Sequence, residues 1–187
     1  MSSNSWNQTL ITAQVDGTAL TNTTTATSLL PAAAKFTMPA NYLKIGDVIR
    51  IKARGRVSTV VTTPGTLTLD VRFGSTVVFN GGAMNLNTTA QTNATWVLDV
   101  DLVVRSIGAS TTATVLGVGE WKSRAIIGSA AVASGGVPVT PLPDTAPAVG
   151  TGFDSTTSFT IDLFGTWSVA NAANSIQVHQ FELALLT

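Results

Sequence analysis

The only histidine of the chain is His179, and a catalytic triad based on serine would have to use it. Its carboxylate partner would be Asp154 or Asp162, which lie in the same C-terminal region. No serine has the surroundings of a nucleophile elbow, the sharp turn that exposes a catalytic hydroxyl. A lone histidine on a predicted strand is more often a hydrogen-bonded structural residue. We therefore interpret His179 as structural and expect no catalytic residue and no enzymatic activity.

A pair of carboxylates stands two residues apart, at Asp99 and Asp101. Side chains at this spacing share one face of a strand. Two carboxylates on one face could act together in glycoside hydrolysis or bind a metal ion. Alternatively, they form salt bridges with basic residues on neighbouring strands. The candidate partners are Arg50, Lys52, Arg54 and Arg72. The salt-bridge interpretation requires no ligand, and we expect neither a metal nor a cofactor.

Two further patterns could bind a ligand. Gly117-Val118-Gly119 lacks the third glycine and the following helix of a dinucleotide site, and such small residues more often mark a bulge or close strand packing. The tryptophans could form a platform for sugar rings, but three of the four fall on apolar faces of predicted strands, which favours core packing. The four are Trp6, Trp96, Trp121 and Trp167.

These residues lie in a chain dominated by alternation of apolar and polar residues, the pattern of strands with one buried face. The predicted strands cover residues 10–15, 28–30, 35–38, 48–54, 67–73, 76–79, 96–104, 115–121, 159–167 and 176–185. Asn80-Gly81-Gly82 is expected to end one strand in a turn, and residues 39–44 are expected to form one helical turn. The parity of apolar residues changes around His179-Gln180, which predicts a β-bulge there.

No long helical period appears, and many short strands at close spacing are typical of β-sandwiches and barrels. We predict a single all-β domain over residues 1–187, an antiparallel β-sandwich of the jelly-roll type. One long loop rich in proline and glycine, residues 128–155, is expected to project from it as an extended loop or arm.

Charge is sparse in this chain. Only 11% of residues are charged and the formal net charge is zero, whereas globular proteins carry about a quarter charged residues. Nucleic-acid binders are usually basic, so we expect no nucleic-acid partner. No apolar stretch reaches the 18 residues of a membrane span, so we expect no membrane partner. A surface with so few charges suits contact with other protein.

The 128–155 segment contains four prolines, almost no charge and no periodicity. Loops this long are uncommon in compact domains and are often functional or disordered. Because proline favours extended conformations, the segment could lie along a neighbouring subunit, the alternative being a flexible surface loop. The candidate interaction residues are Val137, Pro138, Pro141, Leu142, Pro143 and Pro147.

Several stretches of the chain resemble virion proteins of tailed bacteriophages. They are residues 43–56, 66–74, 96–102, 104–108 and 174–183. The resemblance covers most of the chain from Leu43 onward and carries no catalytic motif. It implies a structural component of the particle with a sandwich of the jelly-roll type.

From this resemblance we expect a capsid decoration, or cement, protein at the capsid surface of the virion. Its partners would be the major capsid protein and further copies of itself, most simply as a homotrimer. The alternative is a receptor- or glycan-binding module of a head or tail fibre. That module would need an exposed aromatic residue in a concave patch with a polar rim, and Trp6 and Trp121 are the candidates.

Overall fold

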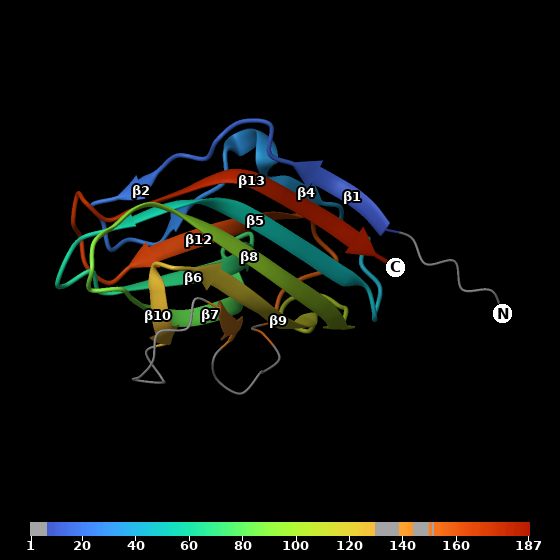
Figure 1. Ribbon diagram of the computed structural model, residues 1–187. Coiled ribbons are helices and arrows are strands. Elements are labelled where there is room, and N and C mark those ends of the chain that lie inside the picture. Colours follow the sequence, from blue (N-terminus) through green and yellow to red (C-terminus); the bar gives the residue numbers. More distant parts are fainter. Residues whose placement is uncertain (1–6, 130–138, 144–149, 151) are drawn as a thin grey trace.

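A computed structural model describes residues 7–129, 139–143, 150 and 152–187. In this part of the chain two antiparallel sheets pack face to face, which confirms the predicted β-sandwich (Figure 1). The larger sheet has the order β1 (Asn7–Thr12), β13 (Ser175–Leu186), β5 (Val48–Thr59), β8 (Gln91–Ser106), β9 (Thr114–Ser123) and β11 (Val139–Leu142), with β2 (Leu20–Thr21) also beside β13.

The smaller sheet has the order β10 (Ile126–Ser129), β7 (Thr76–Leu86), β6 (Thr66–Phe73), β12 (Phe159–Trp167) and β3 (Thr27–Ser28), with β4 (Phe36–Met38) also beside β12. Helical structure in the described residues is one short 3₁₀ turn, η1 (Ala32–Ala34). It is not at residues 39–44, where the predicted helical turn is wrong and the chain forms a non-helical turn.

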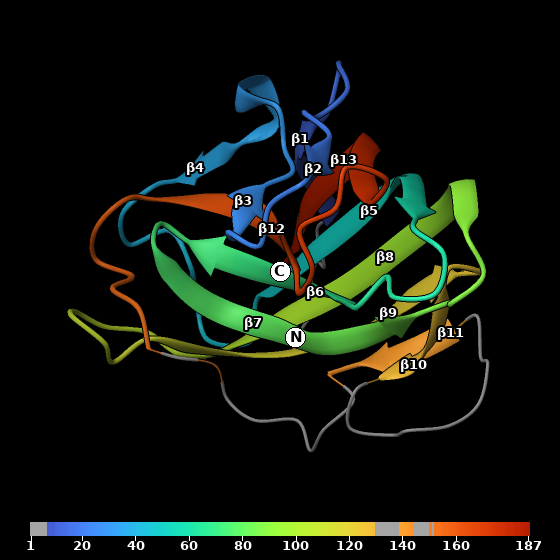
Figure 2. The same cartoon turned by 90° about the vertical axis from the view of Figure 1, so that its left-hand side faces the viewer.

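The strand order is that of a jelly roll. In the larger sheet β13 and β8 flank β5, and in the smaller sheet β12 and β7 flank β6. The chain crosses between the sheets from β5 to β6, from β7 to β8 and from β12 to β13. Each of the first two strands of the jelly roll is interrupted and forms two shorter strands. The first consists of β1 and β2, which both pair with β13, and the second consists of β3 and β4, which both pair with β12. Strands β9, β10 and β11 are an addition that widens both sheets on the opposite side, where β10 and β11 lie close together (Figure 2).

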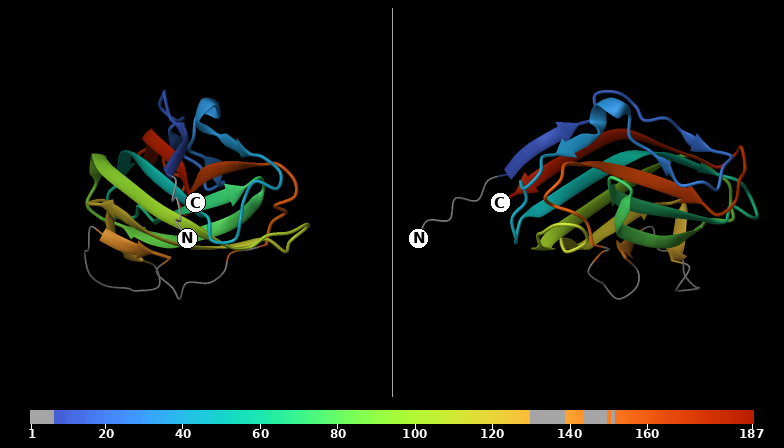
Figure 3. Two further views of the ribbon diagram at one scale, coloured as in Figure 1. Left: turned by 90° about the vertical axis from the view of Figure 1, so that its right-hand side faces the viewer. Right: turned by 180° about the vertical axis from the view of Figure 1, so that it is seen from behind.

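Loops and chain ends gather at the two ends of the sandwich. The first residue of β1, Asn7, is paired with Leu186 near the C-terminus, so both lie at one end (Figure 3). The same end carries the loops before β5 and after β8. The opposite end carries the β5–β6 and β12–β13 loops.

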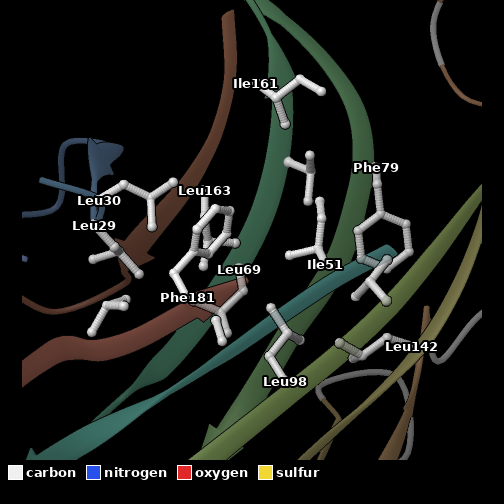
Figure 4. Packing of buried hydrophobic residues seen from close by; sticks show 14 of the residues in the cluster. Leu29, Leu30, Ile51, Leu69, Phe79, Leu98, Leu142, Ile161, Leu163 and Phe181 are labelled. Carbon is white, nitrogen blue, oxygen red and sulfur yellow. The ribbon is translucent and has the colours of Figure 1, made fainter. Parts of the chain in front are cut away.

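Alternate residues of the long strands face the interior and form one core (Figure 4). The three tryptophans of the described residues, Trp96, Trp121 and Trp167, are all fully buried. This confirms core packing for them, and Trp121 is wrong as a candidate for an exposed glycan contact. Trp6 lies outside the described residues. The close strand packing predicted for the glycines of β9 is confirmed at Gly117, because a Cβ there would overlap the Phe79 ring.

Two irregularities of the sheets bear on the predicted strand ends. Asn80-Gly81-Gly82 does not end a strand: β7 runs through it to Leu86, and the pairing register with β6 shifts there. Gly82 adopts a φ of 83°, and its N–H donates to Asn80 Oδ1. The expected turn is therefore a bulge. The predicted bulge in the last strand is confirmed, since the register of β13 on β5 shifts between Val178 and Gln180.

Asn174 fastens two loops at one end of the sandwich. Its side chain is fully buried, its Oδ1 accepts a hydrogen bond from Val60 N at 2.9 Å, and its Nδ2 donates to Pro64 O at 3.1 Å. We expect Asn174→Ala to lower the free energy of unfolding by about 2 kcal/mol, because it leaves buried backbone groups without partners. Chemical denaturation measures this. Asn171→Ala in the same loop removes one exposed turn bond and is the control; an equal loss in both variants would contradict the prediction.

Candidate functional site

The strands β13, β5, β8 and β9 lie next to one another in the larger sheet (Figure 1). Their outer face carries charged side chains. On β5 the buried residues Ile49, Ile51 and Ala53 alternate with basic residues that point away from the core. On the other three strands, too, inward-pointing and outward-pointing residues alternate. We call the surface formed by the outward-pointing charged residues the charged face. It consists of Arg50, Lys52, Arg54, Arg56, Asp99, Asp101, Glu120, Lys122 and Glu182.

Asp101 is held by Arg50, its register partner on β5. Two parallel hydrogen bonds of 2.8 Å join the guanidinium to the carboxylate, from Nε to Oδ1 and from the terminal nitrogen to Oδ2. The hydrogen bond with Asp101, reinforced by its charge, raises the pKa of Arg50 above its ordinary value. The salt-bridge interpretation is thus confirmed for Asp101. Arg72 lies on the smaller sheet and pairs with Asp70 instead.

Asp99 occupies the next position on the same face, between Lys52 of β5 and Glu120 of β9 in the register. Its Oδ1 is buried and has no hydrogen-bond partner in the described part of the chain. The surrounding recess holds about 280 Å³ and is lined mainly by charged side chains: Arg50, Lys52, Asp99, Asp101 and Glu120. Among the described residues no group of three or more His, Cys, Asp or Glu is placed to hold a metal ion.

His179 lies at the bulge of β13, and its Nδ1 is 2.9 Å from Asp16 Oδ1. Neither candidate triad carboxylate is this partner. Asp162 is buried on β12 of the other sheet, where it binds Lys35 Nζ at 2.8 Å and accepts a hydrogen bond from Ser28. Asp16 was missed at the sequence level, because it lies 163 positions from His179 in a segment without strand periodicity.

The 128–155 segment contributes a strand where a loop or arm was expected. β11 pairs with β9 at the edge of the larger sheet, with Pro141 exposed and Pro143 half-buried. Leu142 is only 1% exposed and belongs to the core, near Phe79 and Leu98 (Figure 4). Leu142 is therefore wrong as a contact residue, and the contact role of Pro141 and Pro143 stays a prediction. The remaining candidates, Val137, Pro138 and Pro147, lie outside the described residues.

A second recess, of about 550 Å³, lies at the end of the sandwich that carries Asn7 and the C-terminus. Tyr42 lies in its wall with 39% of its surface exposed, and its hydroxyl is 3.2 Å from Gln8 Oε1. The other lining residues are mostly polar in type, although apolar atoms form the larger part of the exposed lining: Asn7, Gln8, Asn41, Lys44, Asp47, Leu185 and Thr187. An aromatic ring with amides and a carboxylate around it is a combination that can bind a sugar ring.

The loop after β11 is tied to this end through Ser155 and Asp154. Ser155 is buried and exchanges hydrogen bonds with Gly108, and its carbonyl accepts one from Asn41 N. Asp154 Oδ1 accepts hydrogen bonds from the hydroxyl of Thr156 at 2.6 Å and from its amide at 2.8 Å. The Thr156 hydroxyl, followed by the amides of Ser110 and Thr156, holds the pKa of Asp154 below its usual range.

This lowered pKa predicts an acid-sensitive turn. A group whose pKa is lower in the folded state stabilises that state above its unfolded pKa, and the contribution is lost as pH falls through the folded pKa. We expect the amide resonance of Thr156 to titrate below the ordinary range of an aspartate, which is near pH 4. Asp154→Asn should abolish that titration. A midpoint at or above the ordinary value, measured by NMR, would contradict the prediction.

No helix in the described residues is long and apolar enough to cross a membrane. Comparison with known proteins gave no match to a family model, a curated protein or a solved structure.

Proposed function

We propose that this chain is a capsid decoration protein of a tailed bacteriophage, which binds the head shell through protein–protein contacts. The observation that carries the proposal is the charged face, a broad surface on rigid strands with charges of both signs in fixed positions. Such a pattern gives register and specificity to a protein interface. The jelly-roll sandwich and the resemblance of several stretches from Leu43 onward to phage virion proteins support the same assignment.

Such a protein acts only by binding to other proteins. Arg50 and Asp101 already neutralise each other, so that part of the charged face can be buried against a partner without leaving an isolated ion. A protein that binds only the assembled shell shifts the equilibrium toward that shell by mass action. The proposed partner is therefore the major capsid protein, and the proposed location is the outer surface of the virion.

Comparing phage particles with and without the protein tests the proposal. Particles that lack it should release their DNA at a lower temperature or after a milder osmotic shock, and adding the purified protein back should restore their resistance. The Leu142→Ala variant, which disturbs the core and leaves the outer surface unchanged, is the control. It shows whether restoring the resistance requires a stably folded protein. Equal stability of the two kinds of particle, with no protein bound on adding it back, would contradict the proposal.

We further propose that the protein assembles as a homotrimer, with the 128–155 segment contributing to the contact. Val139 and Pro141 on the edge strand β11 are exposed residues of that segment. Light scattering of the intact chain should give a mass about three times the 19.3 kDa of one chain. A mass of one chain at high protein concentration would contradict this prediction.

A second function, glycan binding by a fibre module, is favoured by the recess at Tyr42. Its exposed ring and polar rim meet the requirement for stacking and hydrogen bonding to a sugar. If the recess binds glycans, the protein should bind members of a glycan array, and Tyr42→Ala should abolish binding while the protein stays folded. The absence of binding to every glycan would remove this alternative.

A further inference from the structure

Three arginines gather at one end of the charged face, and we call them the arginine cluster: Arg54, Arg56 and Arg124. All three are exposed. Arg54 and Arg56 stand two residues apart on β5, and Arg124 follows β9. Arg56 and Arg124 line one shallow recess of about 290 Å³ together with Asn93, Ala94 and Thr95.

The two β5 arginines of the cluster differ from the other basic residues of β5 in having no carboxylate as a register partner, although Arg54 lines a recess with Lys52 and Glu182. Arg50 faces Asp101, and Lys52 lies between Glu182 and Asp99. Arg54, in contrast, lies between Gln180 and Val97, and Arg56 lies between Gln177 and Thr95. The register therefore places uncharged residues on both sides of these two arginines.

Hydrogen bonds among the described residues use few of the cluster's donors. One terminal nitrogen of Arg56 donates to Thr95 Oγ1 at 2.5 Å and to Asn93 O at 3.2 Å, both uncharged acceptors. Arg124 makes one long contact of 3.5 Å with Thr92 O. Within the described residues no carboxylate lies within salt-bridge distance of any of the three. A guanidinium presents five donors in a planar fork that fits an oxyanion, so these donors are suited to binding an anion.

The surroundings favour an acidic protein segment over a nucleic acid. Two residues further along β5, the carboxylates of Glu182, Asp99 and Glu120 line the same face and would repel a polyanion that continued in that direction. Single-stranded nucleic acid also needs aromatic rings on which bases stack. Trp96, the aromatic residue nearest in the register, is fully buried below the cluster.

We propose that the arginine cluster binds an extended acidic segment of the partner protein. Residues two apart on a strand are separated by about 6.6 Å, so the pair on β5 matches carboxylates at alternate positions of an extended chain. The role of this contact on the capsid rests on the proposed function. The binding chemistry itself belongs to the isolated protein and is tested there.

The experiment uses the full-length chain and a fluorescent peptide of alternating Glu and Thr, measured by fluorescence anisotropy. A peptide of alternating Gln and Thr and an oligothymidylate are the comparison ligands. We expect binding of the acidic peptide that weakens strongly when the ionic strength is raised to about 0.3 M. Changing all three arginines to glutamine should weaken binding about tenfold or more.

Arg105→Gln is the matched control, because Arg105 is also exposed but lies near the far end of β8. It should change the affinity less than about twofold, and circular dichroism should show that all variants remain folded. Three results would overturn the inference: no binding of the acidic peptide, tighter binding of oligothymidylate, or equal weakening by Arg105→Gln. The stability of the particles is measured in a separate experiment. A failure of peptide binding would therefore not contradict the capsid proposal, and equal particle stability would not contradict binding of an acidic segment by the arginine cluster.

Discussion

Replacing Trp96 with alanine is expected to lower the free energy of unfolding by about 3–5 kcal/mol. The indole is fully buried, and its Nε1 donates to Arg56 O and Gln177 O, each at 3.2 Å. It lies next to Gly55, where a Cβ would come 1.8 Å from Gln177 O and 3.0 Å from Trp96 Nε1. Because domains are stable by about 5–15 kcal/mol, this single change should remove a large part of the total.

Urea denaturation followed by circular dichroism measures the effect. Trp96→Phe is the control that keeps a buried ring but removes the N–H donor, so it should lose less than the alanine variant. A loss below about 1 kcal/mol for Trp96→Ala would show that the indole is not packed as described.

Leu142→Ala is expected to cost about 2–5 kcal/mol, the range for truncating a buried leucine. This residue was a candidate contact in the sequence, and the structure buries it against the core. Gly81 of β7 is close enough that a Cβ on it would lie 3.3 Å from Leu142 Cδ1. The strand β11 therefore contributes to the domain's own stability through this side chain.

The neighbouring Pro141→Ala provides the comparison, since Pro141 is exposed on the same strand. It should change the free energy of unfolding by less than about 0.5 kcal/mol, and any effect should appear in the mass of the assembly. If Leu142→Ala changed the mass and left the stability of the single chain intact, Leu142 would be an interface residue and its place in the core would be wrong.

The fold was predictable where alternation extends over a long strand. The sequence of β8 alternates from Trp96 to Val104, and such a pattern has only one way to bury its apolar side. The strand β11 was not predictable, because it is four residues long, contains Pro141 and lies at a sheet edge, where proline is tolerated. The turn predicted at Asn80-Gly81-Gly82 was wrong because residues that allow positive φ occur in bulges as well as in turns.

The presence of a charged strand face was predictable from the sequence, but the ion pairs within it were not. Alternating basic residues on β5 and two aspartates on β8 indicated a charged strand face. Which charges meet depends on the register between strands about 50 residues apart, and a shift of one residue changes every pair. Arg50 with Asp101 was one possibility among several, and Arg72 belonged to the other sheet. The arginine cluster follows from the same register, because only the pairing shows that Arg54 and Arg56 have uncharged neighbours.

A map of the intact particle by electron cryomicroscopy tests the central proposal most directly. We predict density for this jelly roll on the outer surface of the capsid shell, present in regular copies and in contact with the major capsid protein. The charged face, with the arginine cluster, should lie toward that contact. Density for the protein only in a tail or fibre, or its absence from the particle, would contradict the proposal that it decorates the capsid.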